Sequence, residues 1–485
     1  MSKSSTKTIL SATNNHAGND SEKVKVAIIG GGIAGLSCAA HLSQSTSFEP
    51  TVFDTGRLRP GGRCSSRQPG DKAKNRRENK DRILNRFIID HAAQILTVTD
   101  NKEFDAFKTQ VEQWEKHGIV KEFPSQSVVE ILKERDSNGA ENDKSGNDVV
   151  QKPFIRSLNN RGNTKMYYGT NGMGSIASAI AYPQNDEDND QAMFKIEQDV
   201  WISPSNGVKF IGSSNDPKWT VQTNGKRFGT YDAVVIAHNG KCADRLMSRT
   251  PAKALHSLLR TNFNANVPAW GGKRMTLNSI YSLTIALKKG SSPISDVLDD
   301  GVISAFVKNE PTLRFLTCQS RKFDAGKENE DIEVWTILSS AKFAKKYKGP
   351  QENLPADRVE EVTNLMLESL GSSLGLQAGS LHQGIVLDSR LQLWGAGVPL
   401  NVWAPKEEEK SISSEENGFL FDVENGVGVC GDWLLDPSIP GAWESGRRLS
   451  NWFVKSDKHS VGLPPDGGAF RISKAAAGSG IGNIR

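Results

Sequence analysis

A short apolar run followed at once by closely spaced glycines constrains this chain more than any other feature. Residues 24–42 read VKVAIIGGGIAGLSCAAHL. The first six have the length and β-branched content of a buried strand, and the residues after the glycines fit a helix. Gly30, Gly32 and Gly35 form the spacing G-x-G-x-x-G between them. Strand, glycine turn and helix together predict a dinucleotide-binding βαβ unit, with the phosphates at the N-terminus of the helix.

Each glycine has a separate role in such a turn. Gly30 permits the tight turn itself, and Gly32 lets the backbone approach a pyrophosphate closely. Gly35 lets the helix pack closely against the strand. Ile33 and Ala34 open the predicted helix, where free N–H groups favour a bound phosphate, so we include them among the cofactor-binding residues.

A second predicted strand, PTVFD, ends in Asp54, nineteen residues after Gly35. This is the expected place for a carboxylate that accepts the hydroxyls of a ribose. Gly61, Gly62 and Arg63 follow soon after. Paired glycines let a chain pass close to a ligand, and an arginine there can reach phosphate. The glycine turn alone suits NAD or FAD alike, but nicotinamide dehydrogenases lack this G-G-R element.

Length and composition place these motifs in a larger protein. A chain of 485 residues is too long for one ordinary core and suits two domains. Hydrophobic residues make up 36% and 45 residues are glycine, so much of the chain is predicted to be loop or insertion. The net charge of +4 is small and gives no case for binding nucleic acid. No apolar run is long enough to predict a membrane-spanning helix.

Cysteines and histidines form no recognised site pattern. No two cysteines form a CxxC pair, and an odd number spread widely argues against a disulfide framework. We therefore expect reduced thiols in an intracellular, cytoplasmic protein. The histidines lack HExxH or other metal-ligand spacing, so no metal site is predicted. The five cysteines are Cys38, Cys64, Cys242, Cys318 and Cys430.

The ends and three inner stretches are predicted to lie outside the packed framework. Residues 1–23 have no apolar h-region, which argues against a secretory signal and favours a disordered tail. Their Ser and Thr content weakly resembles a plastid or mitochondrial transit peptide, but they contain no arginine. Residues 457–485 are expected to form a second flexible tail. Polar insertions are expected at 67–86, 134–150 and 405–418.

Secondary structure in the remainder is predicted from periodicity. Short β-branched and aromatic runs predict strands at 231–238, 281–289 and 332–340. Helical patterns lie at 102–118 and 356–374. In the first helix one face carries four apolar residues, and Gly118 follows as the expected C-cap. Those four are Phe104, Phe107, Val111 and Trp114.

These elements predict two interleaved domains. One is an α/β domain built on the glycine turn, and the other combines a sheet with helices. We expect the first to comprise residues 24–100, 165–245 and 420–456. The second is expected to comprise residues 101–164 and 246–419.

The segment after Arg63 resembles one branch of the flavoprotein superfamily that includes monoamine oxidase and polyamine oxidase. Joined across the inserted loop, GGRCSSR and FIIDHAAQILTVTD (87–100) resemble renalase and the renalase-like oxidoreductases of bacteria and plants. Ala92 replaces the family's usual glycine, and Ile95 and Leu96 replace its aromatic pair. The resemblance implies a Rossmann-like FAD-binding domain of the GR2-type (p-hydroxybenzoate hydroxylase and amine oxidase-like), with a second α+β substrate domain.

A late segment of the chain resembles the same family. The apolar run at 427–430 ends in Gly431 and Asp432, and GAWESG follows at 441–446. In these flavoproteins such a Gly-Asp binds the ribityl-pyrophosphate region, and a helix N-terminus then faces the flavin. The resemblance therefore implies that Gly431, Asp432, Gly441 and Ala442 bind FAD.

The same resemblance implies the reaction. FAD, held non-covalently, would accept hydride at N5 from a small donor such as a dihydronicotinamide isomer related to NAD(P)H, and O2 would reoxidise it to give H2O2. Loss of hydride leaves a stable aromatic cation, so this donor needs no protein base. Trp394, in a segment resembling the family's pocket motif, and Trp443 are candidate pocket residues; the catalytic residues stay unassigned.

Other aromatic and polar residues fit a structural role better. Trp335 on a predicted strand is expected in the core, whereas Trp270 is left open. Lys288 could correspond to the lysine near N5 of amine oxidases, but a solvated strand edge is the better interpretation. Cys430 is expected to be a small buried thiol.

Two other functions stay open at this point. The diffuse middle region, 246–380, also permits a flavin amine oxidase or desaturase with a larger substrate. The replacements at Ala92, Ile95 and Leu96 also permit a non-catalytic dinucleotide-binding scaffold or sensor.

Overall fold

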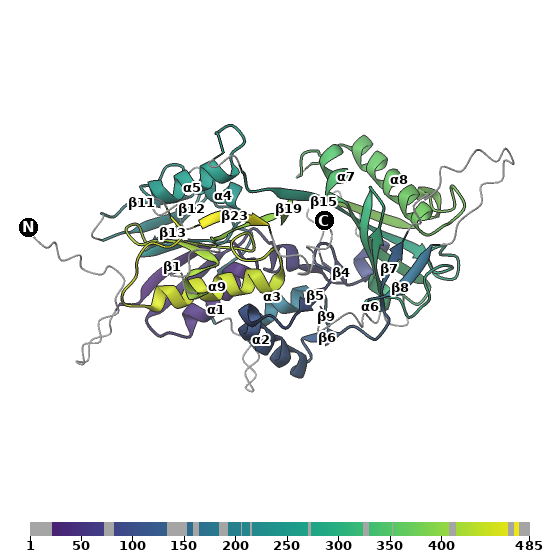
Figure 1. Ribbon diagram of the computed structural model, residues 1–485, viewed down its shortest axis with the longest axis horizontal. Helices are drawn as coiled ribbons and strands as arrows, with labels where there is room; N and C mark the ends of the chain where they lie inside the picture. The colour runs from purple at the N-terminus through teal and green to yellow at the C-terminus, as the bar shows by residue number, and fades with distance from the viewer. Residues whose placement is uncertain are drawn as a thin grey trace, which may run out of the picture.

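The computed structural model describes residues 22–71, 82–132, 153–158, 164–183, 193–204, 206–213, 216–269, 273–323, 329–351, 353–406, 414–463 and 470–474. The predicted N-terminal tail lies almost wholly outside these residues, as does Trp270. Most of the three predicted insertions also lies outside them. In the described part the chain forms two domains joined by long strands (Figure 1).

The first domain is built on a six-stranded sheet. Its strand order is β10-β2-β1-β14-β22-β21, and every neighbouring pair is parallel except β21 with β22. The central strands are continuous apolar runs, as expected where helices cover both faces. This is the open, mostly parallel arrangement that the glycine motif predicted. The bounds are β10 (Lys195–Glu197), β2 (Phe48–Phe53), β1 (Val24–Ile29), β14 (Ala233–Ile236), β22 (Val427–Cys430) and β21 (Phe419–Asp422).

Helices cover both faces of this sheet (Figure 1). On one face, α1 (Ile33–Ser43) packs along α9 (Ile439–Val454), and α4 (Gly240–Met247) and α5 (Lys253–Phe263) lie on the other. A Cβ at Gly446 would lie 2.1 Å from the Ala34 carbonyl oxygen, so only glycine permits this approach of the two helices. The first and the last parts of the chain therefore form one packed unit.

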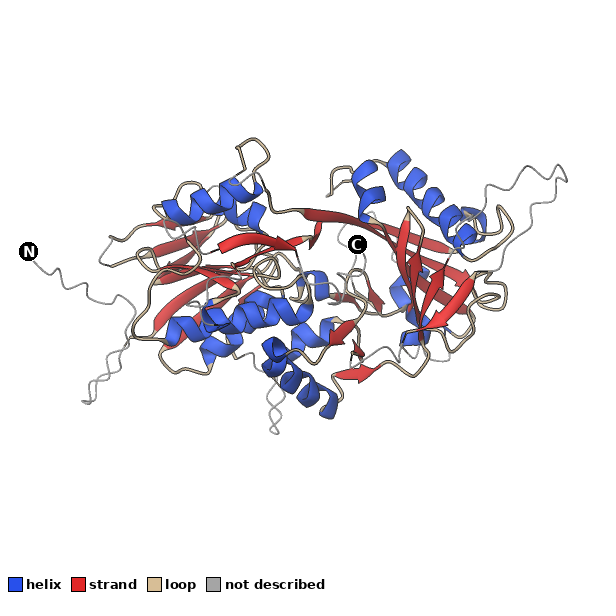
Figure 2. Cartoon of the chain, in the orientation of Figure 1, coloured by secondary structure: helices blue, strands red, loops and turns tan. Residues whose placement is uncertain are grey.

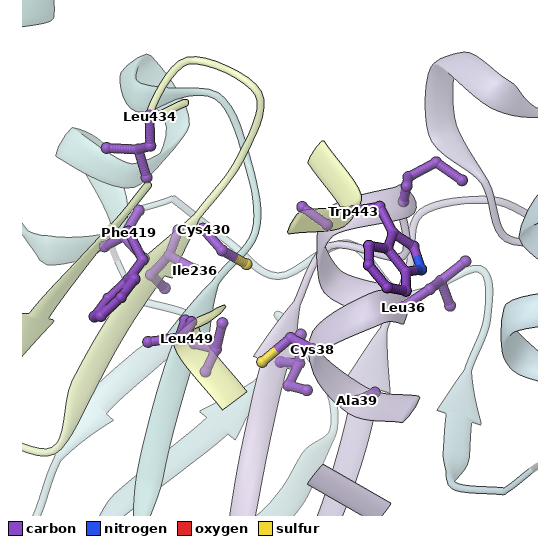
Figure 3. Close-up of a cluster of buried hydrophobic side chains, with 14 of the residues drawn as sticks. Leu36, Cys38, Ala39, Ile236, Phe419, Cys430, Leu434, Trp443 and Leu449 are labelled. Carbon is purple, nitrogen blue, oxygen red and sulfur yellow. The ribbon is translucent and has the colours of Figure 1, made fainter. Parts of the chain in front are cut away.

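The core between α1, α9 and the sheet is apolar and tightly enclosed (Figure 3). Cys38 of α1 and Cys430 of β22 lie within it as free thiols, each fully buried. Burial raises the pKa of Cys38 well above its usual value, so this thiol stays protonated and inert. Cys430 is thus the buried thiol that the sequence predicted.

The second domain is a seven-stranded sheet whose longest helix lies along one side (Figure 2). All neighbouring strands are antiparallel except β16 with β7, which gives the α+β character that was expected. The strand order is β19 (Asp388–Pro399), β15 (Leu277–Lys288), β18 (Ile332–Ser339), β17 (Leu313–Cys318), β16 (Ser304–Lys308), β7 (Val128–Leu132) and β8 (Phe154–Ser157). The helices are α6 (Gln319–Lys322), α7 (Ala341–Lys346) and α8 (Ala356–Ser373).

Two twelve-residue strands, β15 and β19, connect the domains. Ile280 near the start of β15 packs in the core of the first domain, whereas Leu283 and Ile285 pack in the core of the second. The paired β19 runs alongside, with Ile280 opposite Trp394. This ribbon therefore carries side chains of the second domain to the edge of the first (Figure 2).

Smaller sheets complete the fold. They comprise β5 (Leu96–Val98), β9 (Lys165–Gly169) and β6 (Val120–Glu122); β11 (Val208–Phe210), β12 (Trp219–Gln222) and β13 (Arg227–Tyr231); β3 (Ser66–Arg67) with β4 (Ile89–Asp90); and β20 (Asn401–Pro405) with β23 (Phe470–Lys474). The other helices are α2 (Asp105–Lys116) and α3 (Gly174–Ala181). No helix in the described ranges combines the length and apolar character that a membrane crossing requires.

The periodic segments of the sequence were predicted correctly. The three strand runs are β14, β15 and β18, and the two helical patterns are α2 and α8. At the end of α2, Gly118 has φ +69°, and its N–H donates to the Glu115 carbonyl oxygen. The N–H of Ile119 donates to the Trp114 carbonyl oxygen. This is a Schellman motif, so Gly118 ends the helix as expected.

Some predicted boundaries need correction. Helix α2 was assigned to the second domain, but Phe107, Val111 and Trp114 pack in the first core, against α9. Helix α5 was likewise assigned to the second domain, yet Phe263 contacts Trp433 of the first. Apolar periodicity predicts a helix face but not the surface that covers it. The predicted C-terminal tail includes β23, which pairs with β20.

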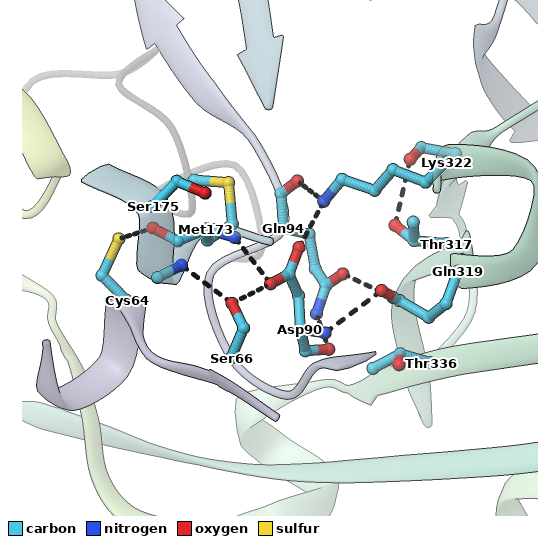
Figure 4. Close-up of polar contacts among 12 residues, drawn as sticks. Cys64, Ser66, Asp90, Gln94, Met173, Ser175, Thr317, Gln319, Lys322 and Thr336 are labelled. Atoms are coloured by element: carbon cyan, nitrogen blue, oxygen red, sulfur yellow. Dashed lines mark hydrogen bonds and ion pairs between the residues drawn. The ribbon is translucent and has the colours of Figure 1, made fainter. Parts of the chain in front are cut away.

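A fully buried ion pair joins the two domains (Figure 4). Lys322 Nζ lies 2.7 Å from Asp90 Oδ2, and both side chains are completely buried. Asp90 Oδ1 also accepts hydrogen bonds from Ser66 Oγ at 2.5 Å and from the Met173 N–H at 2.7 Å. Lys322 donates a second bond to the Gln94 carbonyl oxygen. One carboxylate thus holds four separate segments of the chain together.

We predict that Lys322→Met costs about 3–5 kcal/mol of stability, because it leaves the Asp90 carboxylate buried without its cation. Denaturant unfolding of the variant measures this loss. Lys308→Met is a matched control in the same domain, since its ion pair with Glu130 is partly exposed and should contribute less than about 1 kcal/mol. Equal effects of the two substitutions would contradict the role given to Lys322.

Candidate functional site

A cavity of about 280 Å³ lies at the carboxyl ends of β1, β14 and β22, where parallel sheets of this kind bind ligands. The second domain closes it from the opposite side. Two surface clefts are larger, about 560 and 590 Å³, but neither includes the glycine turn. The residues that line the smaller cavity from the first domain include Gly30, Gly31, Gly32, Ile33, Ala34, Asp54, Thr55, Gly61, Gly62, Arg63, Cys64, His238, Asn239, Gly431, Asp432, Ser438, Ile439 and Ala442.

The three glycines of the turn differ in what surrounds them. Gly30 has φ +122°, and a Cβ there would lie 2.9 Å from the Ala237 carbonyl oxygen. A Cβ at Gly35 would lie 2.0 Å from the carbonyl oxygen of Gly30, so glycine lets α1 pack on the turn. A Cβ at Gly32 would meet no atom within 4 Å. Packing therefore does not require glycine at position 32, and this half-buried residue lines the cavity.

Asp54 follows β2 and reaches the same turn. A Cβ at Gly31 would lie 2.6 Å from the carboxyl carbon of Asp54, so the carboxylate lies against the glycine backbone. Burial raises the pKa of Asp54, and the nearby N–H groups of Gly56, Gly31 and Thr55 oppose that rise. Its Oδ2 nonetheless has no hydrogen-bond partner of ordinary geometry among the described residues. A buried oxygen that accepts no hydrogen bond is available to a ligand hydroxyl.

The Gly-Gly-Arg element approaches the glycine turn directly. The Gly61 N–H bonds to the Gly31 carbonyl oxygen at 2.7 Å, and Gly61 and Gly62 have φ of +129° and +56°. Arg63, which the sequence predicted to reach a phosphate, lines the same cavity as the glycine turn. Its guanidinium lies 2.8 Å from Asp432 Oδ2 and donates to the Gly397 carbonyl oxygen at 2.6 Å. Arg63 thus links the late Gly-Asp to strand β19.

The late segment forms a second glycine-containing wall. Gly431 and Asp432 follow β22, and the Gly431 N–H bonds to Ser445 Oγ of α9 at 2.8 Å. Ser438 caps α9 by accepting the Gly441 N–H at 3.0 Å. Ala442 lines the cavity, whereas Gly441 does not. A Cβ at Gly441 would lie 2.1 Å from the Asp436 carbonyl oxygen. Gly441 is required for packing of the turn before α9.

The wall from the second domain comes chiefly from one face of β19. Trp394, Ala396 and Val398 alternate along the strand and all line the cavity. The Trp394 ring stacks on His91 with centroids 5.5 Å apart and an interplanar angle of 4°, and its Nε1 donates to the His91 carbonyl oxygen at 3.2 Å. Stacking and hydrogen bond together fix the orientation of this ring.

The other tryptophan candidate is not a pocket residue. Trp443 is 4% exposed, makes edge contacts with His41 and Phe107, and does not line the cavity. The reason is helical geometry: the neighbouring Ala442 faces the cavity, so the next side chain turns toward α1 (Figure 3). Trp335 is fully buried in the second core, and Lys288 is exposed at the far end of β15, both as expected.

Several lining residues had no signal that we recognised in the sequence. His238 and Asn239 follow β14, and Gln351 lies after α7. Gln351 Oε1 accepts the Gly395 N–H at 2.9 Å, a tertiary contact that sequence spacing does not encode. Ala396 and Val398 could have been found, because they share the period-two face of Trp394.

Two histidines at the site stay neutral at physiological pH. Burial lowers the pKa of His238 to about 4. Burial, together with the nearby charge of Arg67, lowers the pKa of His91 to about 4. Neither imidazole is therefore charged above pH 5, and the cavity wall does not change charge through them near neutrality.

A comparison with known protein families agrees with the fold of the first domain. Residues 28–110 match the family model of the NAD(P)-binding Rossmann-like domain. Among solved structures, the chain is similar to a putrescine oxidase variant redesigned in its cofactor binding, with 12% identity, 89% of this chain and 99% of that chain covered, and a TM-score of 0.46. It is also similar to an oxidoreductase from Methanosarcina mazei, with 12% identity, 88% of this chain and 100% of that chain covered, and a TM-score of 0.49. A third similar structure is cyclohexylamine oxidase from Brevibacterium oxydans IH-35A, with 11% identity, 89% of this chain and 99% of that chain covered, and a TM-score of 0.49. These TM-scores and identities are too low for the likenesses to bear on activity.

The residues present fit a dinucleotide. The open side of Gly32 can receive a pyrophosphate, and the unpartnered Oδ2 of Asp54 can accept a ribose hydroxyl. Asp432 lies at the cavity beside the N-terminus of α9, where a helix dipole favours negative charge. Among the described residues no group of three or more His, Cys, Asp or Glu side chains could hold a metal ion.

We predict that the protein loses stability as the pH falls from about 6.5 to about 4. The unfolded chain takes up protons on His91 and His238 at pH 6.5, whereas the folded chain does so only near pH 4. Each histidine can therefore cost at most about 3 kcal/mol over this interval. When thermal unfolding is measured from pH 7.5 to 4, the Tm of His238→Gln should fall less with decreasing pH than the Tm of the parent protein. Parallel profiles would contradict the neutral, buried state of His238.

Proposed function

We propose that this chain is an FAD-dependent oxidoreductase of the renalase-like type, which oxidises a small dihydronicotinamide donor. The observation that carries the proposal is the convergence of three separate sequence segments on one cavity. The glycine turn, the Gly-Gly-Arg element and the late Gly-Asp with α9 all line it, and β19 closes it. These segments also carry the family resemblance, so one site brings together the residues that FAD binding would need.

Individual residues have distinct roles in this proposal. The backbone of Gly32 and the first turn of α1 would hold the pyrophosphate, and Asp54 would hold a ribose. Asp432, positioned by Arg63, would contact the ribityl region. The α9 N-terminus, near Ala442, would stabilise negative charge on the ring system. FAD supplies the hydride-accepting chemistry when bound.

Trp394 is the proposed platform for the donor. It faces the cavity from the second domain, and its orientation is fixed by His91. A flat, rigidly held indole suits a planar nicotinamide ring, since aromatic rings stack with little loss of conformational entropy. We assign this residue to donor binding and not to proton transfer.

The ionisable groups at the cavity agree with a donor that needs no base. Those that line it are Asp54, Arg63, Cys64, His238 and Asp432. Arg63 and Asp432 pair with each other, and burial raises the pKa of Cys64 far above neutrality. In the overall reaction the donor loses a hydride and becomes an aromatic cation. O2 takes up that hydride and one proton to form H2O2, which balances atoms and charge.

We predict that Gly32→Val yields protein without bound flavin, because the side chain would fill the space that a pyrophosphate needs. Residue 32 is also the N-cap of α1, so a stability cost of about 1 kcal/mol is expected in the absence of cofactor. Visible absorption of the purified protein measures the flavin. Gly301→Val is a matched control, because a Cβ there also meets no atom within 4 Å but Gly301 does not line the cavity. A variant that retains full flavin would refute the phosphate site.

A second prediction concerns the donor. Without oxygen, a panel of reduced nicotinamide isomers should bleach the flavin absorption of the parent protein, and admitting O2 should restore it with release of H2O2. If only amines or unsaturated substrates bleached the flavin absorption, an amine oxidase or desaturase would be favoured instead. If the protein took up no flavin from added FAD, this result would favour a non-catalytic dinucleotide-binding scaffold or sensor.

Trp394→Ala should raise the donor KM by about tenfold or more, since base–aromatic stacking is worth about 1–3 kcal/mol. Flavin content should stay unchanged. Trp443→Phe serves as the control, because this ring lies in the core and not at the cavity.

A further inference from the structure

The larger of the two surface clefts, about 590 Å³, lies where α9 meets the start of α2. Three segments line it: η3 (Lys102–Phe104) with the first residues of α2, η7 (Ser414–Glu416), and the part of α9 that follows its first turn. No described residue lines both this cleft and the cavity at the glycine turn. Its volume is in the range of small-molecule sites. The cleft is therefore a second, separate place where a ligand could bind.

One side of α9 forms a wall of this cleft. Its lining residues from this helix recur every three or four positions, which places their side chains on one face. Nearly all of them are charged or polar, so the wall is suited to a polar ligand and not to an apolar one. They are Glu444, Arg447, Arg448, Asn451, Trp452 and, directly after the helix, Lys455.

A buried arginine joins the three segments. The Arg448 side chain is 5% exposed, and its Nη2 donates to the Glu103 carbonyl oxygen at 3.2 Å. Its Nη1 donates to the Asn417 carbonyl oxygen at 3.3 Å and lies 3.5 Å from Glu103 Oε1. One guanidinium thus links α9 to η3 and to the residue after η7. These contacts hold the walls of the cleft in fixed positions.

The carboxylates that line the cleft each have a cationic partner. Glu444 is fully buried, and its Oε2 accepts a hydrogen bond from Arg447 Nε at 2.8 Å. Glu415 Oε2 lies 3.1 Å from Lys455 Nζ, and Glu103 pairs with Arg448. Glu444 Oε1 has no hydrogen-bond partner among the described residues, but this oxygen is itself enclosed by the protein. The exposed part of the cleft therefore presents few unused acceptors.

Several donors in the cleft are unused. The Arg447 side chain is 27% exposed and bonds to Glu444 through Nε, and neither of its Nη groups is hydrogen-bonded to a described residue. Lys102 and Asn451 are exposed, and within the described ranges their side chains also have no bonding partner. A guanidinium with both Nη groups available presents a fork that matches the oxygens of an anion. The unused groups thus favour an anionic ligand.

We propose that this cleft binds the phosphate group of a small molecule. Arg447 would donate to the phosphate through its two Nη groups, while Lys102 supplies a second charge and Asn451 an amide donor. A phosphate has an oxygen for each of these three residues, whereas a carboxylate has only two oxygens. Glu444 acts as the positioning residue, because its bond to Nε fixes the plane of the guanidinium. This site does not depend on the proposed flavin chemistry.

The carboxylates at the edge of the cleft limit the class of ligand. Glu103 and Glu415 both line it and are exposed. A long polyanion such as a nucleic acid would extend across them and meet like charges, which disfavours it. A single phosphate group that lies against Arg447 avoids this repulsion.

The experiment is calorimetric titration of the purified protein with inorganic phosphate at low ionic strength. Arg447→Gln should weaken phosphate binding by about tenfold or more, because it removes a charge-assisted fork. Lys102→Gln should weaken it by about threefold, since exposed ion pairs contribute less. Arg358→Gln is the matched control: Arg358 is also a partly exposed helical arginine, paired with Glu361 at 2.9 Å three residues away, but it lies on α8.

Two further arms remove ambiguity. Gly32→Val blocks the phosphate site proposed at the glycine turn, so phosphate binding that persists in this variant belongs elsewhere. Arg447→Gln leaves Glu444 with only Arg448, whose Nε lies 3.7 Å away, so its Tm is measured alongside. Lys102→Gln tests the same cleft without disturbing a buried carboxylate, because Lys102 has no ion-pair partner among the described residues.

The outcomes decide the proposal. Binding that persists in Gly32→Val and weakens in both cleft variants would support the cleft site, whatever the flavin content of the protein. Binding lost in Gly32→Val and unchanged in Arg447→Gln would mean that phosphate occupies only the glycine turn, and would overturn the proposal. No binding at millimolar phosphate would also overturn it. An equal effect of Arg358→Gln would show that overall charge, and not this cleft, attracts the anion.

Discussion

The buried contact between Asp90 and Lys322 is the constraint on which the two-domain arrangement depends. Removing two charges from water is unfavourable unless both are fully paired, and here each group has further hydrogen bonds. Asp90 belongs to the segment after the Gly-Gly-Arg element, and Lys322 ends α6 of the second domain. Separation of the domains at this point would break the ion pair and leave each charge without its partner. The cavity wall that includes Cys64 and Ala93 is thereby held in a fixed place.

A second constraint is the sharing of β19 between the domains. Its outer face, with Leu391 and Leu393, packs on the second core, while Trp394, Ala396 and Val398 face the cavity. Arg63 of the first domain donates to Gly397 in the same strand. The Arg63–Asp432 pair of the first domain and the cavity wall of the second domain are therefore positioned by one strand of backbone. A shift of its register by one residue would turn Trp394 away from the cavity.

The parts that could be predicted from the sequence are those with local physical causes. Gly30, Gly32 and Gly35 identify the turn because backbone conformation and close packing require glycine at fixed spacing. Apolar periodicity found α2, α8 and three strands. It did not show that α2 covers the first core, because a helix face does not specify its partner. Trp443 was misplaced for a related reason, since a family-like segment fixes the helix but not which of two neighbouring side chains faces the cavity. Contacts such as Gln351 with Gly395 exist only after folding.

The site keeps features that stability alone would not select. Asp54 has a buried oxygen without a partner, and Gly32 leaves a backbone surface uncovered at the N-terminus of α1. Filling that space with a methyl group would cost no packing, and pairing the oxygen would gain stability. The acceptor and the backbone each lack a complementary group among the described residues, and one phosphate-containing dinucleotide would complement both. A bound dinucleotide would therefore account for both the unpaired oxygen of Asp54 and the open side of Gly32, neither of which is explained by folding alone.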